Sequence, residues 1–323
     1  MTRLENHKAL LSGVADALGD MLDRVVFVGG AIAGLLLTDD LASDVRPTDD
    51  VDFIVEVATY SEYNSLLADL RKKGFKDELA KKDTPICRMK FDEILVDVLP
   101  TNGDILGFNN IWYPRAMETA TSVSMPTGKM IKVVNAPLFI CTKLDAFGDR
   151  GKGNYRDSHD IEDVVAVVNS RPELWEESWH MPEDVRKYMK DSFEKLRTND
   201  DFQEALPGLL PYGADGRDRI VNRRIATISK YLMAETFSGT IEFSFFKDPV
   251  EAAVITASNY EDELFFPTRT LPTKEDVLEL LKNLGIEDYE GHWARGVGRF
   301  YPVEGIDVAL LARWTLVPPI LNY

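Results

Sequence analysis

The chain is poor in the residues that build thiolate metal sites, disulfide frameworks and membrane spans. Only two cysteines and four histidines occur among its 323 residues, and no pair of them has metal-ligand spacing. Two cysteines do not indicate a disulfide framework. The longest uncharged apolar run has 13 residues, three of them glycine, whereas a membrane span needs about 20. The N-terminus has no apolar core before a small-residue cleavage site, so we expect a cytoplasmic protein that binds no membrane.

Positive charge is also scarce. The chain has 37 Lys and Arg against 54 Asp and Glu, a net charge of −17. Such a chain repels polyanions on average, which argues against a general nucleic-acid coat protein. One local exception is the helix-like segment 217–230, where five basic residues accompany one acid. These arginines can bind RNA phosphates, or they can form a solvated face that pairs with acids elsewhere.

The sequence contains two motifs that look like common phosphate loops and are not. The stretch GGAIAG, which begins at Gly29, lacks the G-x-G-x-x-G spacing of dinucleotide-binding folds. The stretch TGKM lacks the upstream glycine and the following Ser or Thr of a P-loop. A nucleotide site, if present, must therefore be built in another way.

The alternation of apolar patterns predicts an α/β (α+β) protein with a small mixed sheet flanked by helices. We expect strands at 24–30 and 50–57, a hairpin formed by 85–91 and 93–100 with its turn at Asp92-Glu93, and β-rich segments at 116–124 and 129–135. We expect helices over 4–22, 31–41, 61–75, 136–150 and 156–170, with Ser61 as the cap of the third.

The length favours two or three domains. We predict a catalytic domain over 1–170, a mostly helical domain over 171–239 and a small α/β C-terminal region over 240–323, to which no role can be assigned. In the last region we expect a strand near 239–246, a helix over 273–286 and further strands within 292–317.

The stretch TDDVDFIV places acids beside a strongly apolar strand. Residues two apart share a face of a strand, so Val51 and Phe53 lie on the buried face while Asp50 and Asp52 lie on the other. Asp49 falls outside this pair. Two carboxylates held this close repel each other unless a cation lies between them.

A third carboxylate, Asp97, stands in the middle of the apolar strand EILVDVLP, where an unpaired charge is costly. Three carboxylates on two adjacent strands suit Mg²⁺ or Mn²⁺ and are the ligand set of metal-dependent phosphoryl transfer. The alternative is that these acids cap turns or are solvated at strand edges.

Gly29 and Gly30 close a strand and open a helix. Glycine at this place lets a phosphate approach the backbone, and the N-terminus of a helix favours negative charge. A simple tight turn is the alternative.

Together these features resemble the polymerase-β type nucleotidyltransferase superfamily, whose signature is G-G or G-S at a helix start, a D-h-D strand and an Asp on a later strand. The segments RPTDDVDFIV, ILVDVLPT, APLFICTKLDAF and RDSHDIEDVV are similar to the AbiEii-type nucleotidyltransferases. These are toxins of bacterial toxin–antitoxin and phage-defence systems. The resemblance covers roughly residues 20–170 and implies the nucleotidyltransferase fold.

The resemblance also implies roles for individual residues. Asp50, Asp52 and Asp97 would hold the metal, and Asp97 would help to deprotonate the acceptor. Lys143 would meet the triphosphate with support from Asp160 or Asp157, although it can also be an ordinary exposed lysine. The wider set of implied nucleotide contacts is Gly29, Gly30, Thr48, Lys143, Asp160 and Arg150. Arg150 and Arg156 can bind phosphate or pair with Asp149 and Asp157.

The resemblance implies a metal-dependent nucleotidyltransferase toxin that transfers a nucleotide from an NTP, most readily to the 3′ end of tRNA, and it implies a cognate antitoxin as a partner. Arg217, Arg223 and Arg224 of segment 217–230 would then bind the acceptor. A second reading is an enzyme that modifies a protein hydroxyl or a small molecule such as an aminoglycoside. A third is a catalytically silent module that only binds a partner.

Overall fold

The structure is a computed structural model. It describes residues 2–39, 45–78, 85–107, 110–151, 153–211 and 216–232, together with five strands beyond residue 236. The chain divides into two compact units. The first comprises Met1–Ser192 and Asn199–Asp218, and the second comprises Phe193–Thr198 and Arg219–Tyr323. The predicted domain boundaries near 170 and 240 stay a prediction.

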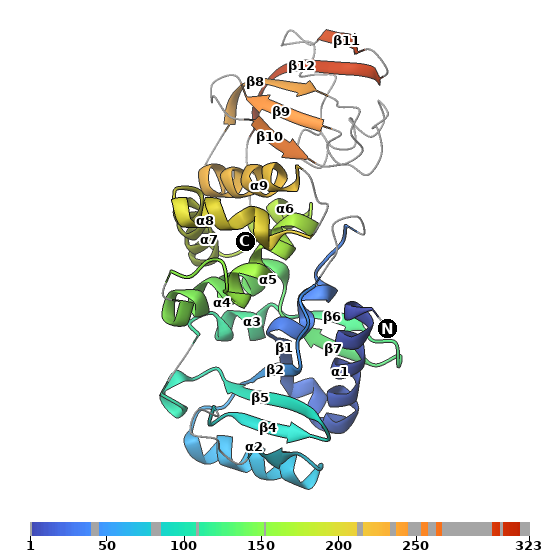
Figure 1. The fold of residues 1–323 in the computed structure, drawn as a ribbon, viewed down its shortest axis with the longest axis vertical. Helices are drawn as coiled ribbons and strands as arrows, with labels where there is room; N and C mark the ends of the chain where they lie inside the picture. The colour runs from blue at the N-terminus through green and yellow to red at the C-terminus, as the bar shows by residue number, and fades with distance from the viewer. Residues whose placement is uncertain are drawn as a thin grey trace. The chain divides into compact units, whose positions relative to one another are not determined.

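The first unit is built on a mixed seven-stranded sheet with the order β3-β4-β5-β2-β1-β7-β6 (Figure 1). The parallel pairs are β2 with β5 and β1 with β7, and the other neighbours are antiparallel. Its strands are β1 (Val25–Val28), β2 (Asp50–Val55), β3 (Lys76–Asp77), β4 (Arg88–Phe91), β5 (Ile94–Pro100), β6 (Thr121–Ser124) and β7 (Met130–Val133). The chain is therefore α+β with a mixed sheet, as the sequence predicts.

Helices accompany this sheet. They are α1 (Arg3–Leu18), α2 (Tyr60–Lys72), α3 (Tyr113–Glu118), α4 (Ala136–Ala146), α5 (His159–Ser170), α6 (Leu174–Trp179) and α8 (Asp200–Ala205). Two further helices, α7 (Glu183–Arg197) and α9 (Arg217–Tyr231), contribute residues to both units. Short 3₁₀ turns lie at Gly19–Arg24, Gly30–Leu35, Gly103–Ile105 and Leu206–Leu209, and one π-turn lies at Phe147–Gly151.

The core lies where the central strands meet the helices. Phe27 of β1 and Phe53 of β2 stand opposite each other, fully buried, with their rings edge to face at 6.0 Å. This geometry adds to the hydrophobic gain from burying two aromatic rings. Helix α4 is buried along most of its length and packs beside α5 (Figure 1). Both helices are thus rigid platforms for any polar side chain that they carry.

Three predicted elements differ locally. The segment after the Gly-Gly pair is a 3₁₀ turn rather than a regular helix. Thr59, not Ser61, caps α2, because Thr59 and Glu62 exchange the two hydrogen bonds of a capping box. The start of the predicted strand at 116–124 is the end of α3. The hairpin with its turn at Asp92-Glu93 is confirmed, and Asp92 takes the positive φ of 50° that the turn requires.

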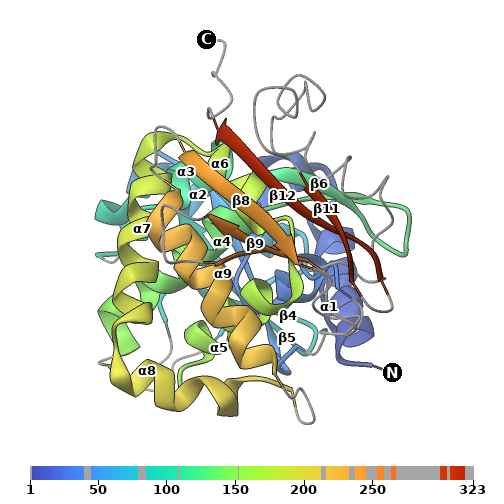
Figure 2. The same cartoon turned by 90° about the horizontal axis from the view of Figure 1, so that it is seen from above.

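The described strands of the second unit form an antiparallel five-stranded sheet with the order β10-β9-β8-β12-β11. The strands are β8 (Phe237–Ser244), β9 (Ala253–Ala257), β10 (Glu263–Phe266), β11 (Arg299–Val303) and β12 (Ile306–Leu316). β8 and β12 run side by side (Figure 2). The strands expected near 239–246 and within 292–317 correspond to β8, β11 and β12, whereas the helix expected over 273–286 lies outside the described residues.

Candidate metal and nucleotide site

The parallel pairing of β2 and β5 brings the three predicted carboxylates together. Asp52 stands directly opposite Asp97, and Asp50 lies two residues earlier on the same face of β2. One carboxylate oxygen from each lies within 4.8 Å of the other two. Among the described residues, this is the one group of three such ligands close enough to hold an ion. Asp49 is exposed and stays outside this group, which we call the Asp triad.

Gly29 and Gly30, next to the triad, lie at positions that leave no room for a side chain. Gly29 has a φ of 73°, a backbone conformation that favours glycine. A Cβ atom at Gly29 would collide with Oδ2 of Asp52, and one at Gly30 would collide with the guanidinium of Arg46. The tight turn at this point therefore lets the chain pass close to a ligand of the triad and to a cation beside it.

Asp52 is a member of the triad whose pKa is raised. Burial, together with the neighbouring charges of Asp50 and Asp97, raises its pKa from the ordinary value of 3.8 to about 7. Near neutral pH this carboxyl therefore holds a proton for part of the time in the metal-free protein. A cation placed among the three acids would remove this penalty.

Two side chains hold the other two acids. Arg88 of β4 donates from Nε to Oδ1 of Asp97 and from Nη2 to Oδ2, both at 2.7 Å, and its Nη2 lies 3.4 Å from Oδ2 of Asp50. The hydroxyl of Thr48 donates to Oδ1 of Asp50 at 2.6 Å. The hydrogen bonds to Asp97 raise the pKa of Arg88. Thr48 is buried, so in this structure it positions a carboxylate.

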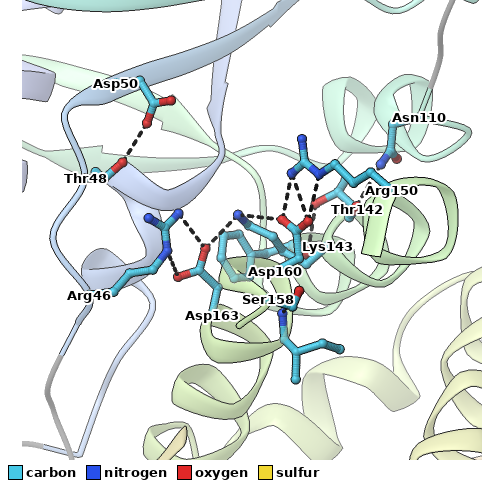
Figure 3. A network of polar contacts seen from close by, with 12 residues as sticks. Arg46, Thr48, Asp50, Asn110, Thr142, Lys143, Arg150, Ser158, Asp160 and Asp163 are labelled. Carbon is cyan, nitrogen blue, oxygen red and sulfur yellow. Dashed lines mark hydrogen bonds and ion pairs between the residues drawn. The ribbon is translucent and has the colours of Figure 1, made fainter. Parts of the chain in front are cut away.

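A second polar cluster, the Lys143 network, consists of Arg46, Lys143, Arg150, Asp160 and Asp163, and Figure 3 shows it together with Asp50 of the triad. Arg46 pairs with both oxygens of Asp163, at 3.0 and 3.2 Å. The ammonium of Lys143 lies 2.6 Å from Asp163 Oδ2 and 3.3 Å from Asp160 Oδ1. Arg150 in turn donates two bonds of 2.9 Å to Asp160. Three cations thus share two carboxylates in an alternating chain.

Local sequence explains how these side chains are placed. Asn135 caps α4 through a bond from the backbone N–H of Leu138, and Ser158 caps α5 through a bond from that of Ile161. Asp160 and Asp163 are three residues apart on α5, so they share a face toward Lys143 of α4.

The two buried cations of the network, Lys143 and Arg46, remain charged, because their acidic partners raise both pKa values. Burial alone lowers the pKa of Lys143, but the charges of Asp163 and Asp160 outweigh it and raise that pKa. Burial raises the pKa of Asp163, but Lys143 and Arg46 lower it overall. Lys143, Arg46 and Asp163 therefore stabilise one another's charged forms.

Both clusters border one cleft of about 500 Å³. The cleft is lined by the triad, by the four cations named above, and by Gly30, Pro85, Gly151, Asn154, Asp157, Ser158, His159 and Asp160. A cleft of this size accommodates a small ligand such as a nucleotide. The Asp triad contributes mainly acids to this lining, and the Lys143 network contributes mainly cations.

Several predicted roles can now be compared with the structure. Lys143 is 6 % exposed, so the reading of an ordinary exposed lysine is wrong. Arg150 pairs with Asp160 and not with Asp149. Asp160 contacts Lys143, as expected of its supporting residue, whereas Asp157 bonds to Asn154. The pairing expected between Arg156 and Asp157 is also replaced, because Arg156 contacts Glu204 at 3.2 Å.

Segment 217–230 forms a helix, α9, and its described arginines differ in exposure. Arg217 is 5 % exposed and its Nη1 bonds to Asp39 at 2.9 Å, and Arg224 is 7 % exposed. Arg223 is half-buried. Buried guanidinium groups cannot reach RNA phosphates without rearrangement, whereas Arg219 on the same helix is exposed, so acceptor binding by this helix stays a prediction.

Sequence reasoning missed three residues of the site. Arg88 could have been found from the hairpin, because counting back from its turn pairs Arg88 with Asp97. Asp163 could have been found from its helical spacing to Asp160. No local pattern distinguishes Arg46 from an exposed arginine of a loop.

No family model matches the chain, and no curated protein matches it with significant sequence similarity. None of the described helices is long and apolar enough to cross a bilayer.

Proposed function

We propose that this protein is a metal-dependent nucleotidyltransferase of the polymerase-β type that transfers a nucleotide from an NTP to a hydroxyl group. The observation that carries the proposal is the Asp triad on β2 and β5, at a cleft whose remaining lining includes the cations of the Lys143 network. Acids for a metal and cations for phosphates are the two parts that phosphoryl transfer requires.

The residues of the triad fit Mg²⁺ or Mn²⁺. All three donors are carboxylate oxygens within 4.8 Å of one another, and hard divalent cations prefer such oxygens. When bound, the ion would polarise the transferred phosphate and promote ionisation of the attacking hydroxyl. The absence of a side chain at Gly29 leaves Asp52 room for its place in the triad.

Other residues of the cleft would bind the phosphates and position the metal ligands. Arg150, whose side chain is 71 % exposed, and the ammonium of Lys143 border the cleft and would bind the phosphates. Two of the three N–H donors of Lys143 are directed to Asp163 and Asp160, which leaves one for a phosphate oxygen. Thr48 and Arg88 position Asp50 and Asp97.

For the acceptor we propose the 3′ end of tRNA, in line with the resemblance to AbiEii-type toxins, and for the biological role a toxin with a cognate antitoxin. Two of the basic residues of segment 217–230, Arg217 and Arg224, are buried, whereas Arg219 is exposed, so this helix gives only part of the support for RNA binding that the sequence offered. A protein hydroxyl or a small molecule therefore remains an alternative acceptor.

The experiment is to incubate the protein with each α-labelled NTP, Mg²⁺ and a mixture of total RNA and protein, and to ask which macromolecule becomes labelled. We expect label in tRNA, none in EDTA and none with Asp52→Ala. The matched control is Asp49→Ala, because Asp49 is exposed and outside the triad. This variant should label the acceptor at nearly the wild-type rate.

Each other outcome has a definite meaning. Transfer by Asp52→Ala at the wild-type rate would refute the metal assignment. Label in protein, or only in an added aminoglycoside, would change the acceptor and leave the chemistry in place. No label from any NTP or acceptor would favour a module that only binds a partner.

A further inference from the structure

Arg88 occupies the place where the proposed metal would bind. Its guanidinium contacts two members of the triad, Asp97 at 2.7 Å through two bonds and Asp50 at 3.4 Å. It therefore bridges two of the three carboxylates between which an ion would lie. Among the described residues, Arg88 is the cation that forms ion pairs with the triad.

The carboxylate oxygens of Asp50 and Asp97 already accept hydrogen bonds. Both oxygens of Asp97 accept from Arg88, and the two oxygens of Asp50 face Thr48 and Arg88. A divalent ion that takes one oxygen from each acid would share them with a guanidinium, and the two positive charges would repel each other at this short distance. The ion and Arg88 therefore compete.

We propose that Arg88 is an exchangeable counter-ion, which holds the triad together in the metal-free protein and releases Asp50 and at least one oxygen of Asp97 when the metal binds. The released guanidinium then binds the phosphates of the NTP. A guanidinium fork suits this second task because its donors match phosphate oxygens in pairs. This inference rests on the proposed function, because it needs the triad to bind a metal.

The surroundings of Arg88 permit such a movement. Its side chain is 22 % exposed and borders the cleft, so it can turn toward a ligand without unpacking the core. Its backbone stays fixed by the pairing of Arg88 with Asp97 in the hairpin. Arg46 and Lys143 differ, because both are held by Asp163, which is not a member of the triad. These two cations can keep their partners when the metal binds.

The test measures binding of Mn²⁺ alone, by calorimetry or electron paramagnetic resonance, to the wild type, Arg88→Gln and Arg88→Ala. The Gln variant keeps most of the side chain and loses the charge, in case Ala does not fold. Removal of one charge-assisted pair should tighten Mn²⁺ binding by about tenfold, since the ion no longer has to displace a guanidinium. Binding of an NTP analogue with a non-cleavable α–β bridge, at saturating Mn²⁺, should weaken by about tenfold or more.

The matched control is Arg71→Gln. Arg71 forms a similar pair with Asp77 through three bonds, but this pair is exposed and lies outside the cleft. It should change neither affinity. Weaker Mn²⁺ binding by both Arg88 variants would overturn the proposal, because Arg88 would then support Asp97 in the metal-bound state. Unchanged Mn²⁺ binding would overturn it as well.

Failure of the proposed function gives a different result. In that case the wild type itself would not bind Mn²⁺, or the Asp52→Asn variant would bind Mn²⁺ as tightly as the wild type. Either result would refute both the proposed function and the exchange of Arg88 for the metal. If the wild type binds Mn²⁺ through the triad and the Arg88 variants do not bind it more tightly, only the exchange is wrong.

Discussion

Replacement of Asp52 by Asn should stabilise the metal-free protein, and by an amount that depends on pH. The folded protein raises the pKa of Asp52 from 3.8 to about 7, first through burial and then through Asp50 and Asp97. The folded state therefore binds this proton more tightly than the unfolded state does. The stability of the wild type must fall as pH rises from about 4 to about 7, and it stays low above that range.

The size of the effect follows from the pKa. Each pH unit between the two values corresponds to about 1.4 kcal/mol, so the upper limit is about 4 kcal/mol above pH 7. Asp52 borders the cleft and is only partly buried, which gives it some contact with water and lowers the expected value to about 2 kcal/mol. Asn has the same shape as Asp and no charge, so the variant avoids this cost.

The assay is urea unfolding in EDTA at several pH values, followed by circular dichroism. The difference in free energy of unfolding between Asp52→Asn and the wild type should be small near pH 4 and should grow to a plateau above pH 7. Addition of Mg²⁺ at pH 8 should stabilise the wild type more than the variant, because binding to the folded state adds to its stability. Asp49→Asn, which changes an exposed acid outside the triad, is the control and should give no such curve.

Two results would refute this reasoning. A difference that does not change with pH would mean that Asp52 has an ordinary pKa. A variant that is less stable than the wild type at pH 8 would mean that the Asp52 carboxylate is favourably solvated or paired. Either result supports the alternative that these acids are independently solvated at strand edges.

Three further predictions follow from the site. Gly29→Ala should weaken Mn²⁺ binding and reduce the free energy of unfolding by about 1–3 kcal/mol, because it combines a positive φ with a collision against Asp52. Mn²⁺ titration and thermal unfolding measure the two effects. Gly148→Ala is the control, because a Cβ at Gly148 meets nothing within 4 Å. Lys143→Met should reduce the free energy of unfolding by about 3 kcal/mol and weaken NTP binding, because the buried acids Asp160 and Asp163 lose a cation. The control is Lys90→Met, which removes an exposed pair with Glu93 and should change neither quantity. Expression of the wild type should slow bacterial growth while Asp52→Ala should not, and equal growth curves would count against the toxin role.

The acidic half of the site could be predicted because it depends on short-range rules. The period of two residues places Asp50 and Asp52 on one face of β2, and the apolar setting of Asp97 marks it as a paired or metal-bound charge. The hairpin turn at Asp92-Glu93 sets the register of β4 against β5, and from it the contact of Arg88 with Asp97 could also have been derived.

The basic half could be predicted only in part, because Lys143 and Asp160 lie 17 residues apart whereas other ion pairs join distant segments. Arg46 meets Asp163 across 117 residues, and Arg217 meets Asp39 across 178 residues. Which cation pairs with which acid is decided by tertiary packing, and no local pattern records it. For the same reason the sequence predicts that α9 is a helix, whereas the burial of Arg217 and Arg224 within it follows only from the tertiary structure.

The two halves of the cleft differ in how their charges are balanced, and this difference constrains the ligand. The Asp triad has three carboxylates and one paired cation, Arg88. The Lys143 network has three cations and two carboxylates. A free metal ion satisfies only the first half, and a free polyphosphate satisfies only the second. A complex of Mg²⁺ with a triphosphate carries both charges a few ångströms apart, so it complements the acidic and basic parts of one cleft together. This charge pattern, more than any single residue, favours a metal–nucleotide complex as the ligand.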